Sequence, residues 1–429
     1  MRKHFYLFLL LAVSVLLYSC QKDDNVPQTD YSIESTSAFE LISQHPNGWI
    51  KEAQYLRGID QPSEEFEYYD NGYIKSAKIY ASYPQQHLYM EVNRSEDNKP
   101  LWSKYYTPEG DLWFETEYEN GFPSVKKVYS EQGTSVHSYT SGELTSVEFT
   151  AADNSSSSIT SYNAAAGTRN LRITRNGESI LDEDYAYQEQ VGVGVYTGNH
   201  VPVANPFVAA ETSYNKLNQS FYQSPSWQFD ADPIEMMYPY RLYDEFYYPG
   251  SYFATSFAVS TDLYQSVIEQ YPVTEKGVLM GGTKYIDGFD QIQNSWAVRD
   301  SLAGIYEQDP ALYELKYGDE YAIKLGYGKI IFVIGAIRNL PTSQAAAEEI
   351  KQVAYRKMMG LLNGNNEITA GEQQLLNKVW FEVKFFSTLK QHLNGVVIDS
   401  AEDYEQAMQE VNDAELSAIQ LEYQPVEWL

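Results

Sequence analysis

The sequence predicts a multidomain, β-rich protein. We expect an N-terminal all-β repeat of antiparallel hairpins and a C-terminal α+β domain with a bent four-stranded antiparallel sheet flanked by helical clusters. Three observations predict this fold class. Tyrosine accounts for 38 of the 429 residues, and tyrosine favours strands with one solvated face. Asn-Gly pairs recur among alternating apolar and polar residues in the first half, whereas the second half mixes helical periodicity with β-branched runs.

An Asn-Gly pair begins two similar segments, residues 47–53 and 71–77. Both residues of such a pair accept the positive φ of a type I′ turn, so the pattern predicts a run of antiparallel hairpins over residues 36–185. Weaker copies follow at residues 105–112 and 119–122. The units resemble the YD and MORN-like repeats of bacterial surface proteins. Two roles stay open for this domain, a rigid stalk or ligand-binding face and a plain scaffold.

The amino terminus has the features of an export signal. Arg2 and Lys3 precede an apolar run, residues 5–18, which is too short to span a bilayer. We therefore expect a signal peptide over residues 1–19. The residues Leu-Leu-Tyr-Ser-Cys that end at Cys20 resemble the lipobox of bacterial lipoproteins, which implies that Cys20 is acylated and begins the mature protein. The alternative is a structural cysteine, although the chain has no second thiol to pair with it.

Lys22, Asp23 and Asp24 follow the cysteine directly. They resemble the export signal that Bacteroidetes lipoproteins carry to the cell surface, which implies an outer-membrane lipoprotein exposed on the cell. The alternative is an acidic tether that its charge keeps soluble. Residues 20–35 are rich in polar side chains, so we expect them to form a flexible tether.

Composition and motifs exclude several function classes. The net charge of -29 repels nucleic acid and anionic lipid headgroups. The sequence contains no His-Glu-x-x-His or Gly-x-Ser-x-Gly motif, and its six histidines are scattered. We therefore expect no enzyme activity, no catalytic residue, no metal site and no cofactor. With 59 acidic residues, a carboxylate pair of the glycosidase kind stays open as an alternative.

The repeats stop at a Pro- and Asn-containing linker predicted at residues 186–215, and the pattern beyond it is that of helices mixed with strands. We assign residues 216–429 to a second domain. Strands are expected at 321–325 and 329–336, separated by a glycine bend, and at 416–423. Helices are expected at 310–315, 343–359 and 401–411, with Ser343 as a helix cap. Residues 379–385 alternate like a strand, or else end a helix begun at Gly371.

A motif in this domain resembles a known family. Residues Tyr317, Gly318, Asp319, Glu320 and Tyr321 form an aromatic-Gly-polar-polar-aromatic stretch, and Gly326, Tyr327 and Gly328 follow it. Together they resemble the signature of the MACPF and cholesterol-dependent cytolysin superfamily of pore formers, over roughly residues 245–429. The resemblance implies a sheet that bends at Gly326 and Gly328, where glycine permits the change of backbone direction.

The resemblance also implies a function. In the family, two helical clusters beside the sheet refold into membrane-spanning hairpins, and residues 263–315 and 340–378 are long enough to hold them. We expect the chain to lack the terminal cholesterol-binding domain of cytolysins, so that membrane contact falls to the repeats or to the lipid on Cys20. The expected function is a surface lipoprotein, a toxin or antibacterial, that self-associates into rings on membranes and forms pores. The alternative is a non-lytic cell-envelope lipoprotein for adhesion or for binding a glycan or protein receptor.

Overall fold

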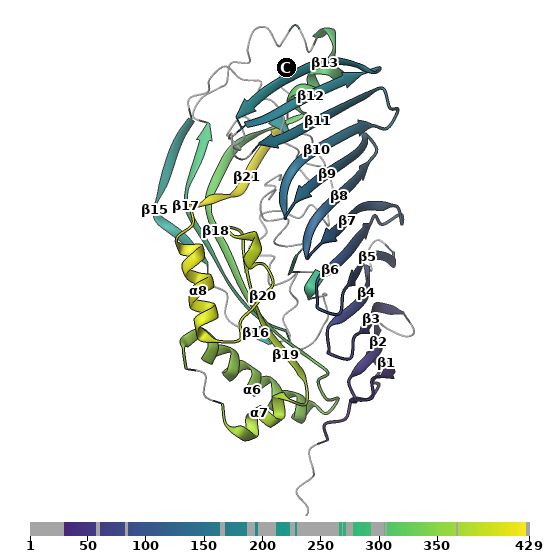
Figure 1. Ribbon diagram of the computed structural model, residues 1–429, viewed down its shortest axis with the longest axis vertical. Helices are drawn as coiled ribbons and strands as arrows, with labels where there is room; N and C mark the ends of the chain where they lie inside the picture. The colour runs from purple at the N-terminus through teal and green to yellow at the C-terminus, as the bar shows by residue number, and fades with distance from the viewer. Residues whose placement is uncertain are drawn as a thin grey trace, which may run out of the picture.

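The computed structural model describes residues 30–56, 61–81, 85–163, 168–186, 194–195, 212–223, 228–229, 266–267, 269–271, 278–292, 304, 307–365 and 368–425. These residues form two antiparallel sheets, with helices packed on the second (Figure 1). The predicted fold class, an antiparallel β-repeat followed by an α+β domain, is confirmed. Cys20, Lys22, Asp23 and Asp24 lie outside the described residues, as do the predicted signal peptide and most of the predicted linker.

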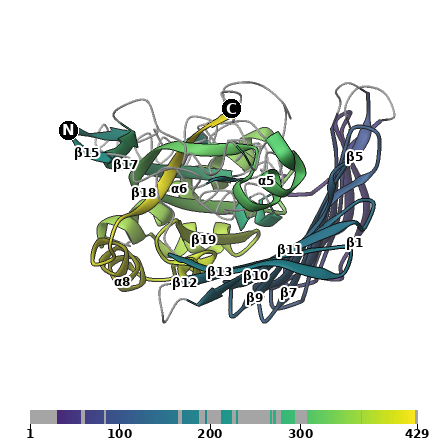
Figure 2. The ribbon, with the colours of Figure 1, turned by 90° about the horizontal axis from the view of Figure 1, so that it is seen from above.

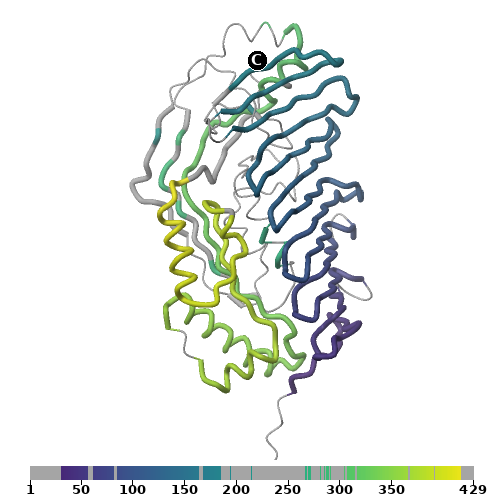
Figure 3. The backbone as a smooth tube through the Cα atoms, in the orientation of Figure 1, coloured from purple at the N-terminus to yellow at the C-terminus, as the bar shows by residue number. Residues whose placement is uncertain are grey.

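The first sheet contains thirteen strands, and each strand pairs with its neighbours in the sequence. Figure 3 shows the chain climbing from β1 to β13 in successive hairpins. The strands are β1 (Phe39–Gln44), β2 (Ile50–Leu56), β3 (Pro62–Tyr68), β4 (Ile74–Ala81), β5 (His87–Arg94), β6 (Pro100–Tyr106), β7 (Leu112–Glu119), β8 (Phe122–Ser130), β9 (Gly133–Thr140), β10 (Glu143–Ala151), β11 (Ser156–Asn163), β12 (Thr168–Arg175) and β13 (Glu178–Ala186).

The turns of this sheet correct one prediction. At the first two Asn-Gly pairs only the glycines, Gly48 and Gly72, have positive φ, so these are not type I′ turns. The reason is that the Asn47 side chain makes two hydrogen bonds. Its Oδ1 accepts from the backbone N–H of Trp49, and its Nδ2 donates to the carbonyl oxygen of Asp70 in the next turn. Farther along, Asn120 and Gly121 both have positive φ, at 54° and 89°, as the type I′ prediction requires.

The second sheet has eight antiparallel strands, and its four long neighbours run in the order β15, β17, β18, β19. Its strands are β14 (Gly194–Val195), β15 (Thr212–Gln223), β16 (Gln228–Phe229), β17 (Val278–Ile292), β18 (Glu320–Arg338), β19 (Trp380–Ser387), β20 (Val396–Val397) and β21 (Ser417–Pro425). The helices are α5 (Pro310–Tyr317), α6 (Gln344–Asn363), α7 (Ala370–Leu376) and α8 (Ala401–Asn412), with a 3₁₀ turn at Gln391–Leu393. Among the helices of the described residues, none is both long and apolar enough to cross a membrane.

Two sequence expectations about this domain are wrong. Residues 321–336 form one unbroken strand within β18, and the glycine segment appears there only as register shifts in the pairing with β17 and β21. Residues 263–315 are not one helical cluster, because 278–292 form the long strand β17 in their midst. The helix α6 begins after Ser343 as expected, although the Ser343 side chain makes no capping hydrogen bond.

Strand β18 is buried on both faces, because the second sheet is the middle one of three layers. The first sheet lies on one side of it and the helices lie on the other. Ile330, Phe332 and Ile334 point to the first sheet and join one core with Phe66 and Met90. The alternate residues of β18 point to the helices and share a core with α6 and α8, among them Ile331 and Val333. Each fully buried side chain of this size contributes roughly 1.5–3 kcal/mol. Figure 2 shows the first sheet curving alongside the second domain.

Gly72 lies where a turn of the first sheet meets β19. A Cβ at this position would come within 2.6 Å of the Trp380 ring, and the φ of Gly72 is +85°. Gly48 has the same φ, yet a Cβ there would meet no atom within 4 Å. We expect Gly72→Ala to lower the free energy of unfolding by about 2–4 kcal/mol. The cost of a positive φ at alanine and the overlap of its Cβ with the Trp380 ring both contribute.

The matched substitution Gly48→Ala has the positive φ without the steric overlap, so it should lower the free energy of unfolding by only about 1 kcal/mol. Urea unfolding of both variants measures the difference. Equal losses for the two glycines would mean that the turn does not press on Trp380.

Candidate functional site between the two sheets

One row of cross-strand neighbours runs along the face of the first sheet that meets the second domain. Its members, in the order of the strands from β2 to β12, are Ala53, Phe66, Ala77, Val92, Ser103, Thr116, Lys126, His137, Val147, Thr160 and Leu171. The row is apolar in β2–β5 and polar in β6–β9. The apolar end packs on β18 and β19, whereas Thr116 and Lys126 of the polar stretch line a cavity between the sheets.

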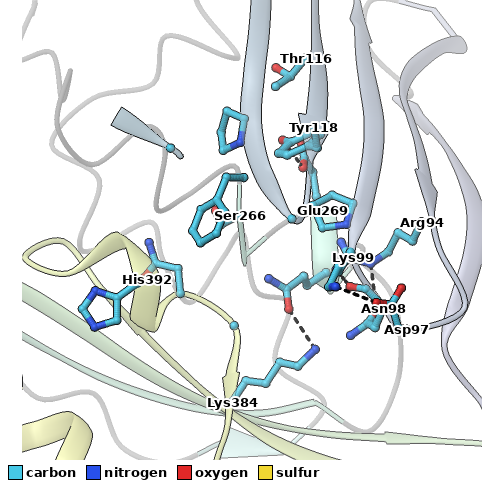
Figure 4. Close-up of a pocket in the computed structure, with 18 of the residues that line it drawn as sticks. Arg94, Asp97, Asn98, Lys99, Thr116, Tyr118, Ser266, Glu269, Lys384 and His392 are labelled. Carbon is cyan, nitrogen blue, oxygen red and sulfur yellow. Dashed lines mark hydrogen bonds and ion pairs between the residues drawn. The ribbon is translucent and has the colours of Figure 1, made fainter. Parts of the chain in front are cut away.

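The cavity has a volume of ≈ 280 Å³ and is walled by both sheets and by Ser266, Glu269 and Gln270. Figure 4 shows Arg94 and Tyr118 from the first sheet, Glu269 from the intervening segment, and Lys384 on β19. His392 also lines the cavity, and more than half of its side chain is exposed. Charged groups from distant parts of the chain therefore converge on one space.

A buried ion pair joins Lys384 and Glu382, which are 3% and 8% exposed. Their charged atoms lie 2.7 Å apart, and Lys384 Nζ also donates to Gln270 Oε1 at 3.0 Å. Tyr73 of the first sheet donates its hydroxyl to Glu382 at 2.8 Å. Burial lowers the pKa of Lys384 to about 8, and the negative charge of Glu382 opposes that shift. Burial, and then Glu382, raise the pKa of Tyr73.

A second buried carboxylate, Glu269, accepts two hydroxyl hydrogen bonds from the first sheet. Tyr118 donates at 2.7 Å and Tyr105 at 3.3 Å. Arg338 of β18 donates to the backbone carbonyls of Gly72 and Gln270 and stacks over Trp380 at 4.0 Å. These contacts join the first sheet, Glu269 and Gln270, and the second sheet into one polar network, which is costly to break because its members are buried.

The two parts also meet at the other end of the first sheet. Arg175 on β12 forms a two-pronged ion pair with Asp309, the residue that caps α5. Lys316 near the end of α5 contacts Glu183 of β13 at 3.3 Å. The first sheet is therefore attached to the second domain at both ends of its length.

The motif residues predicted from the sequence lie elsewhere in the second domain. Tyr317 ends α5, Gly318 takes a φ of 76° after it, and Asp319, Glu320 and Tyr321 lead into β18. Tyr321 is buried and Asp319 is exposed. None of these residues lines the cavity.

Gly326, Tyr327 and Gly328 lie inside β18, and neither glycine is among the described residues with positive φ. They mark the point where one edge of β18 changes partner. Residues 320–328 pair with β21, and residues 331–338 pair with β19. Figure 1 shows β17 and β18 curving along this length.

The sequence interpretation missed Arg94, Glu269 and Lys384. One signal was present for Lys384, because it interrupts an otherwise apolar strand together with Glu382. Arg94 and Glu269 stand in polar surroundings in the sequence and carry no such signal. Within the described ranges, no three His, Cys, Asp or Glu side chains are grouped to hold a metal ion.

No family model and no curated protein matches this sequence. Solved structures similar to the chain include stonustoxin, at 10% identity and a TM-score of 0.30, over 56% of this chain and 30% of that one. GNIP1Aa from Chromobacterium piscinae is 12% identical with a TM-score of 0.27, over 55% and 50% of the two chains. A GtfA/B complex bound to UDP and GlcNAc is 13% identical with a TM-score of 0.14, over 38% and 28%.

This chain thus spans half or less of the length of each of these three solved chains. Likenesses at these TM-scores define neither a shared family nor a shared activity. The resemblance of residues 317–328 to the MACPF and cytolysin signature stays a prediction.

Proposed function

We propose that this chain is a surface lipoprotein of the MACPF and cytolysin type, anchored through acylated Cys20, that oligomerises on membranes and forms pores. The observation that supports the proposal is the divided edge of β18. Its first part is covered by β21 and its second part by β19, with Gly326 and Gly328 just before the division. Removal of β21 would leave residues 320–328 with unpaired backbone groups, and such an edge is a template for a strand of another copy.

The connection between β18 and β19 supports the same proposal. It contains α6 and α7, which pack on the second sheet through a core of their own around Ile337, Ile350 and Val379. A segment that leaves the sheet as helices and returns to the adjacent strand is long enough, if extended, to make a hairpin of two strands of ~10 residues each.

Release of a trapped dye from liposomes tests the proposal. The chain without residues 1–20 is added to vesicles of several lipid compositions, and the same samples are viewed by electron microscopy. We expect release together with rings on the vesicles. Intact vesicles and no rings in every composition would refute the lytic function.

A regular pattern on the far face of the first sheet favours the alternative, a non-lytic binding lipoprotein. Glutamate and lysine alternate there as cross-strand neighbours from β3 to β8: Glu65, Lys78, Glu91, Lys104, Glu115 and Lys127. Tyrosine hydroxyls from Tyr80, Tyr106 and Tyr129 donate to three of these carboxylates. Such a ladder makes the sheet rigid and presents a uniform polar surface, as a stalk or a receptor-binding face requires.

A further inference from the structure

Arg94 carries a buried charge on the wall of the cavity. Its side chain is only 3% exposed. Among the described residues its guanidinium donates only to Asn98, from Nε to Oδ1 at 2.9 Å and from Nη2 to the backbone carbonyl. Within the described part of the chain, no carboxylate lies at ion-pair distance from it. Burial lowers the pKa of Arg94 to about 10, so the group stays charged at neutral pH. The charge of Glu269 opposes this shift only in part, and a buried charge without a directly paired anion is costly.

The nearby carboxylates are engaged with other groups. Glu382 is paired with Lys384, and Glu269 accepts from the hydroxyls of Tyr105 and Tyr118. Lys126 lines the same cavity, as does Lys99 at its rim, where it pairs with Asp97. In a chain with a net charge of -29, four cationic side chains therefore line this one cavity against three carboxylates.

We infer that this cavity is a binding site for a small oxyanion, held by the guanidinium of Arg94. A guanidinium presents donors in a planar fork that matches a carboxylate, sulfate or phosphate group. The volume of ≈ 280 Å³ equals the share of about nine water molecules at ~30 Å³ each, which is room for a ligand of monosaccharide size. The hydroxyl of Ser266 and the amide of Asn394 on the walls suit a ligand that also carries hydroxyls.

The site has a mechanical consequence. Arg94 belongs to the first sheet, whereas Lys384 and Asn394 belong to the second domain. A ligand that fills the cavity contacts both parts and stabilises the folded protein, in which they are packed together, because it binds that state alone. This inference is independent of pore formation, because binding is measured without a membrane target.

Calorimetric titration of the full chain, purified in detergent, tests the inference. The probes are sodium sulfate, sodium phosphate and sodium glucuronate, each against sodium chloride of equal ionic strength, with glucose as the neutral control. We expect one saturable site per chain for at least one of the three anions and none for glucose. The anion that binds most tightly identifies the oxyanion class.

Arg94→Met should weaken that binding by about tenfold or more, since a charge-assisted hydrogen bond is lost. The matched change Arg172→Met, at an exposed arginine of β12, should leave affinity unchanged. Arg94→Lys keeps the charge without the fork and should bind with intermediate affinity. Should Arg94→Met not fold, the Arg94→Lys variant decides the question. Absence of saturable heat for all three anions, or equal affinity in wild type and the Arg94 variants, would overturn the inference.

Discussion

A disulfide that joins β21 to β18 is expected to abolish dye release while it is oxidised. Lys324 and Glu422 are cross-strand partners in these two strands. Partners in an antiparallel pair have Cα atoms about 4.5–5.5 Å apart, a separation that a disulfide spans. The variant Lys324→Cys with Glu422→Cys is made in the chain that lacks residues 1–20, which contains no other cysteine.

The reason for the expected loss is topological. If pores need residues 320–328 of β18 to be uncovered, a covalent bond to β21 stops the process before assembly. Release should fall by at least about tenfold in the oxidised protein and return when a reductant is added, because only the bond differs between the two samples.

A matched control places the disulfide where no movement is expected. Ser161 and Asn170 are cross-strand partners in β11 and β12 of the first sheet. Their replacement by a cysteine pair should leave dye release unchanged in both redox states. Dye release by the oxidised Lys324→Cys, Glu422→Cys variant would show that β21 need not leave β18.

Glu382→Gln is expected to destabilise the protein by about 3–5 kcal/mol, because it leaves the buried Lys384 charge without its carboxylate. The substitution preserves shape, so packing changes little. The measurement is urea unfolding at pH 7. The double variant Glu382→Gln with Lys384→Met should recover much of the loss, since it removes the stranded charge as well.

Glu67→Gln is the control for this cycle. Glu67 forms an ion pair with Lys75 at 2.6 Å, but both side chains are about a third or more exposed. An exposed pair contributes about 0–1 kcal/mol, so this variant should unfold close to wild type. A loss at Glu382 no larger than at Glu67 would contradict the buried network.

The pKa of Lys384 adds a pH signature to the same experiment. In the folded state it is lowered to about 8, against 10.5 for the free side chain. Between these values the unfolded chain binds more protons than the folded one, so the stability of the wild type should rise with pH over this interval. Lys384→Met should lack that rise.

Much of the fold followed from local sequence patterns. The Asn-Gly pairs marked hairpins because their backbone preferences are intrinsic to the residues. Apolar periodicity located α8 and α6, whereas the alternation at residues 379–385 left a strand and a helix end equally open, and the structure shows the strand β19 there. The type I′ turns at Gly48 and Gly72 were wrong, because the side chain of Asn47, and that of Asn71, bonds to the neighbouring turn, a contact beyond the reach of local preference.

The sequence by itself determined the β-rich class, the hairpin repeat and the placement of α5, α6 and α8, since these depend on residues close together in the chain. Only the tertiary structure decided that Arg94, Glu269 and Lys384 meet at one cavity, and that one edge of β18 is shared by β21 and β19. Those facts depend on which distant strands lie side by side. Burial makes these charges important for stability, because a charge removed from water is costly unless it is paired.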